Sequence, residues 1–315
     1  MILVTGATGF VGAALVERLA REGVETRACV RRNDVPMPDG IHTVLVEDLT
    51  ANTDWSHALT GVGVIVHTAA RVHVMNDVTN DPLAEFRRTN VQGTLNLARQ
   101  AVAAGVRRFV FISSIKVNGE ATELGFPFSA GDMPAPLDPY GVSKMEAEQG
   151  LRAIGTQTGL EIVIIRPPLV YGFGVKANFA ALMRVVQRGW VMPLGAVHNK
   201  RSLVALDNLV DLIVTCITHP KAAQHIFLVS DGHDLSTTEL VLGLARAAGV
   251  STRLVSMPVW FLQAAAAMVG KGDVAKRLCG NLQVDISKAQ SLLDWTPPIS
   301  VEEGLLKAVK GIQKI

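Results

Sequence analysis

Residues 1–12 read MILVTGATGFVG, and this stretch decides the fold. An apolar run leads directly into Gly6, Gly9 and Gly12, and a helical pattern over 11–22 follows. A buried strand, a glycine turn and a helix bring main-chain amides to a helix N-terminus, where they can hold a pyrophosphate. Only glycine lets the main chain approach such a ligand that closely. The opening residues therefore predict a dinucleotide-binding loop.

The glycine spacing is GxxGxxG, because Ala7 stands where the commoner GxGxxG form has a glycine. A Walker A phosphate loop is excluded, since Ala13 and Ala14 follow Gly12 in place of lysine and a hydroxyl residue. The loop therefore indicates a dinucleotide and not a nucleoside triphosphate.

Short Val/Ile-rich runs alternate with longer helical patterns, such as 11–22 and 84–104, through the first two thirds of the chain. This alternation is typical of an α/β fold, a doubly wound parallel sheet of the Rossmann type with helices on both faces. We expect each strand to be buried on both faces. The expected strands are 2–5, 26–30, 43–46, 64–67, 109–113 and 162–166, with 226–230 as a seventh.

The pattern changes after Gly172, where helical segments with little strand follow. The segment 207–218 and the seventh strand read as returns to the sheet. We therefore predict a smaller, mainly helical C-terminal substrate lobe that is not contiguous. The predicted NAD(P)-binding domain comprises residues 1–172 plus about 203–232. The predicted lobe comprises about 173–202 plus 233–315.

Charge and composition exclude several classes of protein. The formal net charge is +2, and no basic run is longer than pairs such as Arg31-Arg32 and Arg87-Arg88, so no nucleic-acid partner is expected. Cys29, Cys216 and Cys279 are far apart and form no CxxC motif, which favours reduced thiols in a cytoplasmic protein. The 8 histidines lack metal-ligand spacing, and we expect no metal.

Two apolar segments bear on membrane targeting. The N-terminus has no basic region before its apolar run, so we read it as a strand and not as a signal peptide. The stretch 257–270 contains Pro258 and Gln263 and is too short to span a bilayer. It could lie on a membrane surface, although a packed or dimer-facing helix is the favoured interpretation.

The end of the second strand discriminates between the two nicotinamide dinucleotides. An acidic residue there would bind the ribose hydroxyls of NAD, but this strand ends Cys29-Val30-Arg31-Arg32 and Asp34 comes too late. Arg31 and Arg32 could hold a 2′-phosphate with bidentate hydrogen bonds, which favours NADP(H) and leaves NAD(H) possible. The alternative is a pair of solvated arginines. Asp48, followed by Leu49, would suit the adenine amine.

The segment DPYGVSK places Tyr140 and Lys144 one turn apart on a helix that Asp138 and Pro139 should begin. A nearby ammonium favours the phenolate and lowers the tyrosine pKa, which turns a phenol into a proton donor or acceptor. Ser114 and its neighbour Ser113 close the fifth strand, where ligands bind in open α/β sheets.

These motifs follow one another in a recognisable order. They are TGATGFVG from Thr5, HTAA at 67–70, TNVQGT around Asn90, FISS at 111–114, PYGVSK from Pro139 and RPPLVYG from Arg166. With them the chain resembles, over its whole length, the extended short-chain dehydrogenase/reductases: nucleotide-sugar epimerases, dehydratases and reductases. The resemblance implies a homodimer paired through the helices that contain Asn90 and Tyr140.

The same resemblance implies roles for individual residues. Ser114 would orient the substrate hydroxyl or carbonyl, Tyr140 would be the acid/base, and Lys144 would bind the nicotinamide ribose. The implied cofactor residues are Gly6, Gly9, Phe10, Val11, Gly12, Arg31, Arg32, Asp48, Leu49, Ala69, Ala70, Asn90, Tyr140, Lys144 and Pro167. His67 is assigned no chemistry, because a histidine within a buried strand is more often a core residue.

A UDP-sugar is the implied substrate. In this branch the diphosphate is held by an asparagine after the VYG turn and an arginine before a V-x-D segment. Asn178 and Arg201 stand at those places, Arg277 is a looser candidate, and Asn178 could equally cap a helix. The paired carboxylates of dehydratases are missing, since Ile115 and Lys116 occupy their positions.

The favoured activity is reduction of the C4 ketone of a UDP-4-keto-6-deoxy-N-acetylhexosamine, giving a UDP-N-acetylquinovosamine-type sugar for the O-antigen of lipopolysaccharide. Three features favour the reductase over an epimerase: the missing acidic NAD signature, Asn118 in place of a tyrosine, and Leu169 in place of an asparagine before VYG. The main alternative is a UDP-hexose or UDP-N-acetylhexosamine 4-epimerase. A steroid- or flavonoid-type ketone reductase and a non-enzymatic cofactor sensor remain as further alternatives.

Overall fold

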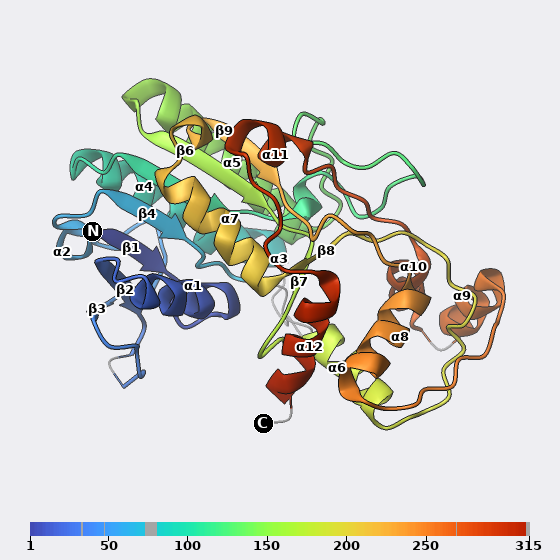
Figure 1. The fold of residues 1–315 in the computed structure, drawn as a ribbon. Helices are drawn as coiled ribbons and strands as arrows, with labels where there is room; N and C mark the ends of the chain where they lie inside the picture. The colour runs from blue at the N-terminus through green and yellow to red at the C-terminus, as the bar shows by residue number, and fades with distance from the viewer. Residues whose placement is uncertain (33, 47, 73–80, 269, 313–315) are drawn as a thin grey trace.

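The computed structural model describes residues 1–32, 34–46, 48–72, 81–268 and 270–312. Its main sheet has seven parallel strands in the order β3-β2-β1-β4-β5-β6-β9 (Figure 1). The strands are β1 (Ile2–Thr5), β2 (Thr26–Val30), β3 (Ile41–Leu45), β4 (Val64–His67), β5 (Arg108–Ile112), β6 (Glu161–Arg166) and β9 (His225–Leu228). The predicted α/β class and doubly wound sheet are confirmed. The order reverses between β1 and β4, which opens a crevice for a ligand at their carboxyl ends.

Helices cover both faces of this sheet. They are α1 (Phe10–Arg21), α2 (Ser56–Leu59), α3 (Pro82–Phe86), the π-helix η1 (Arg87–Gly93), α4 (Thr94–Ala103), the 3₁₀ turn η2 (Ile115–Val117), α5 (Pro139–Thr158), α7 (Leu206–Thr218) and the 3₁₀ turn η3 (Pro220–Ala222). Successive residues of β1 enter opposite cores: Val4 packs with Leu15 of α1, and Leu3 packs with Leu97 of α4. This period of two explains why the central strands read as continuous apolar runs.

The strand β3 departs from the prediction. Burial on both faces was expected, but His42, Thr43 and Leu45 are exposed. The expectation is wrong for this strand because β3 lies at the edge of the sheet and pairs with β2 alone. Edge strands tolerate polar side chains, and such side chains discourage pairing with other molecules.

The predicted single helix over 84–104 is three helical segments in continuous succession, α3, η1 and α4. The wider π turns of η1 contain Asn90 and end at Gly93. A Cβ on Gly93 would lie 2.7 Å from the carbonyl oxygen of Leu49, so the loop after β3 packs directly on this turn. π-turns are frequent at functional sites, and this one contains a candidate cofactor residue.

A second layer of structure lies beside the main sheet. The strands β7 (Leu169–Tyr171) and β8 (Leu203–Ala205) form a separate parallel pair that the sequence did not predict. The accompanying helices are α6 (Ala177–Gln187), α8 (Thr237–Ala248), α9 (Val259–Met268), α10 (Gly272–Cys279) and α12 (Val301–Ile312). The helix α11 (Ser287–Leu293) packs instead against β9 of the main sheet. A third apolar core, separate from the two under the sheet, joins α6, α8 and α12. The predicted domain boundaries stay a prediction, and residues 33, 47, 73–80 and 313–315 within them lie outside the described residues.

The apolar stretch 257–270 forms α9, except that Val269 lies outside the described residues. No residue of α9 is buried, so packing into a core of the same chain is wrong for this helix, and the dimer-facing interpretation stays a prediction. In the described part of the chain no helix is both long and apolar enough to span a bilayer.

The contact between Gly12 and Gly6 gives a test of the fold. A Cβ on Gly12 would lie 2.1 Å from O of Gly6, a main-chain atom that cannot move aside cheaply. We expect Gly12→Ala to lower the free energy of unfolding by about 1–3 kcal/mol. Gly63→Ala is the matched control, since nothing lies within 4 Å of a Cβ there. Denaturant unfolding of both variants measures the difference, and equal stability would contradict the close contact.

Candidate active site

The glycine loop joins β1 to α1 at the centre of the sheet. Gly6 has φ +67°, which favours glycine, and a Cβ on it would lie 2.7 Å from N of Ala69. The amide of Gly9 donates to O of Gly6 at 2.8 Å, which closes the turn. Gly9 caps α1 without any side-chain hydrogen bond, so no side chain occupies the amides of the first turn. The loop therefore fits the pyrophosphate of a dinucleotide.

The neighbouring strand end supports this loop. Thr68 follows β4, and its hydroxyl donates to O of Thr5 at 2.6 Å. Ala69 and Ala70 come next and are partly exposed, with the Ala69 main chain against Gly6. The predicted cofactor residues at the ends of β1 and β4 are thus brought together.

The candidate residues for the adenosine half lie at the ends of β2 and β3. Arg31 and Arg32 are exposed directly after β2, and Nε of Arg32 lies 3.6 Å from Oδ1 of Asp34. Asp48 is also exposed, whereas Leu49 is partly covered by the turn at Gly93. Both arginines therefore follow the end of β2 as predicted, and Asp34 faces one of them, Arg32; their role toward a ribose substituent stays a prediction.

The first turn of α5 presents the candidate acid/base. Asp138 caps the helix by accepting from the amide of Gly141 at 2.6 Å, and Pro139 occupies its first turn, as predicted. Tyr140 is half-buried and meets the ring of Phe86 edge-on at 5.9 Å between ring centroids. Nζ of Lys144 lies 6.0 Å from the centroid of the Tyr140 ring. The predicted pair therefore shares one face of the helix.

Burial dominates the electrostatics of this pair. Lys144 is buried with its Nζ 2.8 Å from O of Ile112, and burial lowers its pKa to about 7, partly opposed by the charge of Glu148. Burial also raises the pKa of Tyr140, with a further contribution from the carboxylate of Asp138. The predicted lowering of the tyrosine pKa is therefore wrong for the protein without bound ligand. Desolvation of the phenolate is the largest cause of this shift.

Ser114 stands at the carboxyl end of β5, half-buried, and its Oγ accepts from the amide of Lys116 at 3.3 Å. Pro167 follows β6, and its carbonyl accepts from the amide of Ile115 at 2.9 Å. The ends of β5 and β6 thus hold the serine and the predicted proline side by side. Ser113 points the other way, into the protein, as alternation along a strand requires.

A buried polar network under the catalytic helix was not predicted. Ser113 Oγ donates to Oε1 of Glu148 at 2.5 Å, and Arg166 donates to both carboxylate oxygens at 2.9 and 2.5 Å. Arg166 also donates to Oδ1 of Asn118 at 2.9 Å. Glu148 lies one turn after Lys144, so the network fixes α5 to β5 and β6. Two features of the sequence could have predicted this network: Arg166 at the end of the apolar run 161–166, and Glu148 four residues after Lys144.

Asn90 braces the site from η1. Its Nδ2 donates to O of Arg71 and to Oγ of Ser143, both at 3.0 Å, and its Oδ1 accepts from the amide of Arg71 at 2.8 Å. Ser143 Oγ in turn donates to O of Tyr140 at 2.8 Å. Asn90 therefore connects the loop after β4 to the first turn of α5.

The candidate diphosphate residues are only partly gathered. Nη1 of Arg201 donates to O of Arg277 at 2.8 Å, and the pKa of Arg201 is lowered by burial and by the neighbouring charge of Arg277. Asn178 lies exposed within α6, whose cap is Lys176, so it is not the cap residue. The amide of Phe128, in the loop after Ser114, donates to O of Gln283 at 2.8 Å, which connects the serine loop to the segment following α10.

Other polar residues near the site are structural. His67 is buried between the hydroxyls of Thr5 and Thr94 at 2.7 and 2.9 Å, and burial lowers its pKa to about 3. It is the hydrogen-bonded core residue expected from the sequence. The Tyr171 hydroxyl donates to Asp231 at 2.7 Å inside the third core. Since the chain has 2 tyrosines, Tyr140 is the one available for chemistry.

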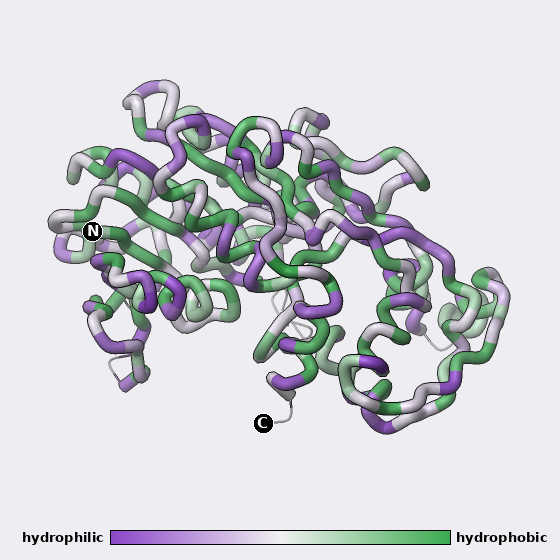
Figure 2. Tube along the Cα trace, in the orientation of Figure 1, coloured by the Kyte–Doolittle hydropathy of each residue, from purple (hydrophilic) through white to green (hydrophobic). Residues whose placement is uncertain are grey.

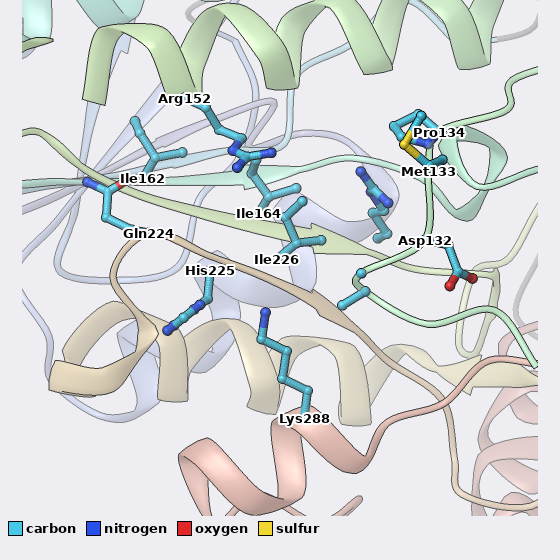
Figure 3. A pocket seen from close by; sticks show the side chains of 13 residues that line it. Asp132, Met133, Pro134, Arg152, Ile162, Ile164, Gln224, His225, Ile226 and Lys288 are labelled. Atoms are coloured by element: carbon cyan, nitrogen blue, oxygen red, sulfur yellow. The ribbon is translucent and has the colours of Figure 1, made fainter. Parts of the chain in front are cut away.

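A hollow at the edge of the sheet is lined by Arg166 of the buried network but by none of the predicted catalytic residues. It has a volume of about 410 Å³ and lies between α5, β6 and β9 (Figure 3). Ile162, Ile164 and Ile226 form its floor, and neither Ser114 nor Tyr140 lines it. The candidate active site is therefore the crevice at the carboxyl ends of the strands and not this hollow.

Comparison with known proteins adds four findings. The family model described as "NAD dependent epimerase/dehydratase family" matches residues 2–230. A UDP-glucose 4-epimerase of Vibrio cholerae is 51% identical over 311 residues, with 98% of this chain and 94% of that protein covered. A 3-beta-hydroxysteroid dehydrogenase of Mycolicibacterium neoaurum is 29% identical over 341 residues, with 98% and 90% covered. The solved structure of MoeE5 in complex with UDP-glucuronic acid and NAD is 27% identical with a TM-score of 0.79, covering 99% of each chain.

The depressed pKa of Lys144 predicts a pH-dependent stability. Between pH 7 and 10.5 the unfolded chain holds a proton at Lys144 that the folded chain does not, so stability from this group rises with pH. The penalty is therefore complete below pH 7 and disappears above 10.5. We expect Lys144→Met to raise the free energy of unfolding by roughly 2–5 kcal/mol at pH 6 and by much less at pH 10.

Denaturant unfolding at the two pH values measures this difference. The control is Lys221→Met, because Lys221 is exposed and its replacement should change stability by about 0.5 kcal/mol or less. A gain at Lys144 that does not depend on pH would show that its ammonium is not desolvated.

Proposed function

The chain belongs to the NAD dependent epimerase/dehydratase family, and we propose that it is a UDP-hexose or UDP-N-acetylhexosamine 4-epimerase. The observation that carries the proposal is the 51% identity, over nearly the whole of both chains, to a UDP-glucose 4-epimerase. The pairing of Tyr140 and Lys144 beside Ser114 supports it, because inversion at C4 requires one group that can both take and return the proton of the C4 hydroxyl.

The chain's own residues would divide the work as follows. When bound, a nicotinamide dinucleotide supplies the hydride acceptor and donor for C4, and the cradle of Gly6, Gly9 and Gly12 fits its pyrophosphate. Tyr140 holds or moves the proton at its hydroxyl, and Ser114 orients the sugar hydroxyl. Lys144 would bind the nicotinamide ribose, and its protonated form would favour loss of the phenol proton, which the raised pKa of Tyr140 otherwise opposes. Arg201 and Arg277 balance the diphosphate, with Asn178 as a further candidate.

A reaction that leaves its cofactor unchanged overall suits NAD, which MoeE5 binds together with a UDP-sugar acid. NADP(H), favoured by the sequence, has only Arg31 and Arg32 in its support. One of these, Arg32, faces Asp34, which would repel a 2′-phosphate. We therefore propose NAD(H) as the cofactor.

The second candidate is the NADPH-dependent 4-ketoreductase expected from the sequence. It is favoured by the two arginines after β2, where no carboxylate stands at the strand end. A steroid-type ketone reductase would bind no UDP, and a cofactor sensor would not need Ser114, Tyr140 and Lys144 together. We also propose, from the resemblance alone, a cytoplasmic homodimer paired through the helices of Asn90 and Tyr140.

Activity measurements separate the two candidates. We expect interconversion of UDP-glucose with UDP-galactose, or of the N-acetyl pair, without net consumption of cofactor. Chromatography of the sugar nucleotides measures it. Stoichiometric oxidation of NADPH by a UDP-4-keto-6-deoxysugar, with no interconversion, would replace the epimerase by the reductase.

The two tyrosines give a matched pair of variants. Tyr140→Phe should lower kcat by about 100-fold or more, because the proton-transfer group is lost while the fold is kept. Tyr171→Phe should cost about 1–3 kcal/mol of stability through the lost contact to Asp231 but leave kcat nearly unchanged. Comparable kcat in the two variants would remove Tyr140 from the mechanism.

Cofactor choice is tested at Arg31. With NAD(H) as cofactor, the wild type binds NAD(H) at least as tightly as NADP(H), and Arg31→Ala changes the Kd for NAD(H) by about threefold or less. Titration of protein fluorescence measures both constants. A wild-type preference for NADP(H) that falls about tenfold in the variant would instead support the 2′-phosphate interpretation.

A further inference from the structure

The helix α9 is apolar in sequence but is not packed into any core of the chain. Every residue in it is apolar except Gln263, yet none is buried. Trp260, Phe261 and Met268 are 69%, 44% and 82% exposed. At 100° per residue these three lie within one third of the helix circumference, so α9 turns its largest side chains toward solvent. Its less exposed face, with Leu262 and Ala265, is the side nearer the rest of the lobe.

Neighbouring segments extend this apolar surface. The amide of Met192 donates to O of Arg253 at 3.0 Å, and the amide of Val255 donates to O of Met192 at 2.9 Å. These bonds place Trp190 and Val191, which are 56% and 59% exposed, beside the segment that leads into α9. The surface defined by Trp190, Val191, Val255, Trp260, Phe261 and Met268 is called the apolar patch below. Figure 2 shows α9 in the green of apolar residues at the outer margin of the lobe.

The two segments that contain the patch carry mostly positive charge, of which Lys200 is paired with Glu239 at 4.0 Å. The segments 184–201 and 250–284, which contain the patch, hold Arg184, Arg188, Lys200, Arg201, Arg253, Lys271, Lys276 and Arg277 against Asp273 alone. The whole chain has a net charge of +2, so the remainder is negative. Arg253 and Lys271, which flank α9, are both exposed, and the guanidinium of Arg188 lies 5.4 Å from the centroid of the Trp190 ring.

We propose that the apolar patch docks on the surface of an anionic phospholipid bilayer, with α9 lying in the plane of the interface. Trp and Phe flanked by cations are the residues that favour the boundary between headgroups and acyl chains. The helix of 10 residues is too short to span, so it binds on one side. A second copy of the chain is the poorer occupant, because its patch would bring the same positive charge.

The contact would hold the lobe, and with it Arg201 and Arg277, near the headgroups. The candidate active site would stay away from the bilayer, since α5 and the turn between β1 and α1 belong to the main sheet and its helices, whereas α9 lies at the far margin of the lobe (Figure 1). The proposal concerns a surface and does not depend on the reaction proposed above.

The test is co-sedimentation of the full-length protein with vesicles of phosphatidylcholine, alone or with 30–40% phosphatidylglycerol as a probe, at low and high salt. We expect binding to the anionic vesicles that weakens about tenfold or more in Trp260→Gln/Phe261→Gln, and also in Arg253→Glu/Lys271→Glu. High salt should weaken it as well. The control is Phe126→Gln/Met133→Gln, at two positions 72% and 87% exposed outside the patch, which should bind as the wild type does.

Thermal unfolding shows whether each variant is folded. If Trp260→Gln/Phe261→Gln does not fold, Arg253→Glu/Lys271→Glu still tests the proposal. Failure of the folded wild type to bind anionic vesicles would overturn the proposal, as would equal loss in the control. The proposal would also be overturned if the patch substitutions left vesicle binding unchanged and altered only the molecular mass in analytical ultracentrifugation. That result would assign the patch to a contact with a second copy of the chain. Patch substitutions that changed only the KM for the sugar nucleotide would assign the patch to substrate binding and would likewise overturn the proposal. All binding is measured without sugar nucleotide, so failure of the epimerase proposal leaves this test unaffected.

Discussion

The close approach of Gly6 and Gly12 is the constraint on which the rest of the molecule depends. With glycine at both positions, α1 starts directly against the end of β1, and the Ala69 main chain closes the turn from the β4 side. Any Cβ would push α1 away from the sheet and cover the amides of its first turn. The crossover between β1 and β4 then decides where the crevice opens, and the ends of β5 and β6 bring Ser114 and Pro167 to the same edge.

The catalytic helix is held by polar groups and not by apolar packing alone. Burying Glu148 with Arg166 brings little net stability, because desolvation of both ions offsets their attraction. Its value lies in orientation, since Arg166 and Ser113 together satisfy both oxygens of Glu148 and so fix the rotation of α5. Asn90 does the same from the opposite side through Ser143. Tyr140 and Lys144 are thus placed by buried polar neighbours.

The electrostatics of the site follow from burial more than from charge pairing. Lys144 loses hydration and retains a main-chain acceptor, so its ammonium is held at a cost. Tyr140 in turn keeps its proton. A ligand in the crevice would add charges of its own and change this balance, which is why the reactive form of the tyrosine belongs to the complex and not to the free protein.

Local features of the sequence determined the seven strands of the main sheet, the glycine loop and the cap of α5, because each depends on residues close to one another in the chain. The same features predicted Ser114, Tyr140 and Lys144 as the residues of the site. The structure alone decided what depends on distant partners. The exposure of β3 follows from its place at the edge of the sheet. Segments far apart in the chain are joined by the pairing of β7 with β8 and by the network of Ser113, Glu148, Arg166 and Asn118. The pKa of Tyr140 depends on how deeply its side chain is buried. The stretch 257–270 shows the same division: its composition indicated an apolar helix, but which face would be covered, and by what, depended on packing that composition does not encode.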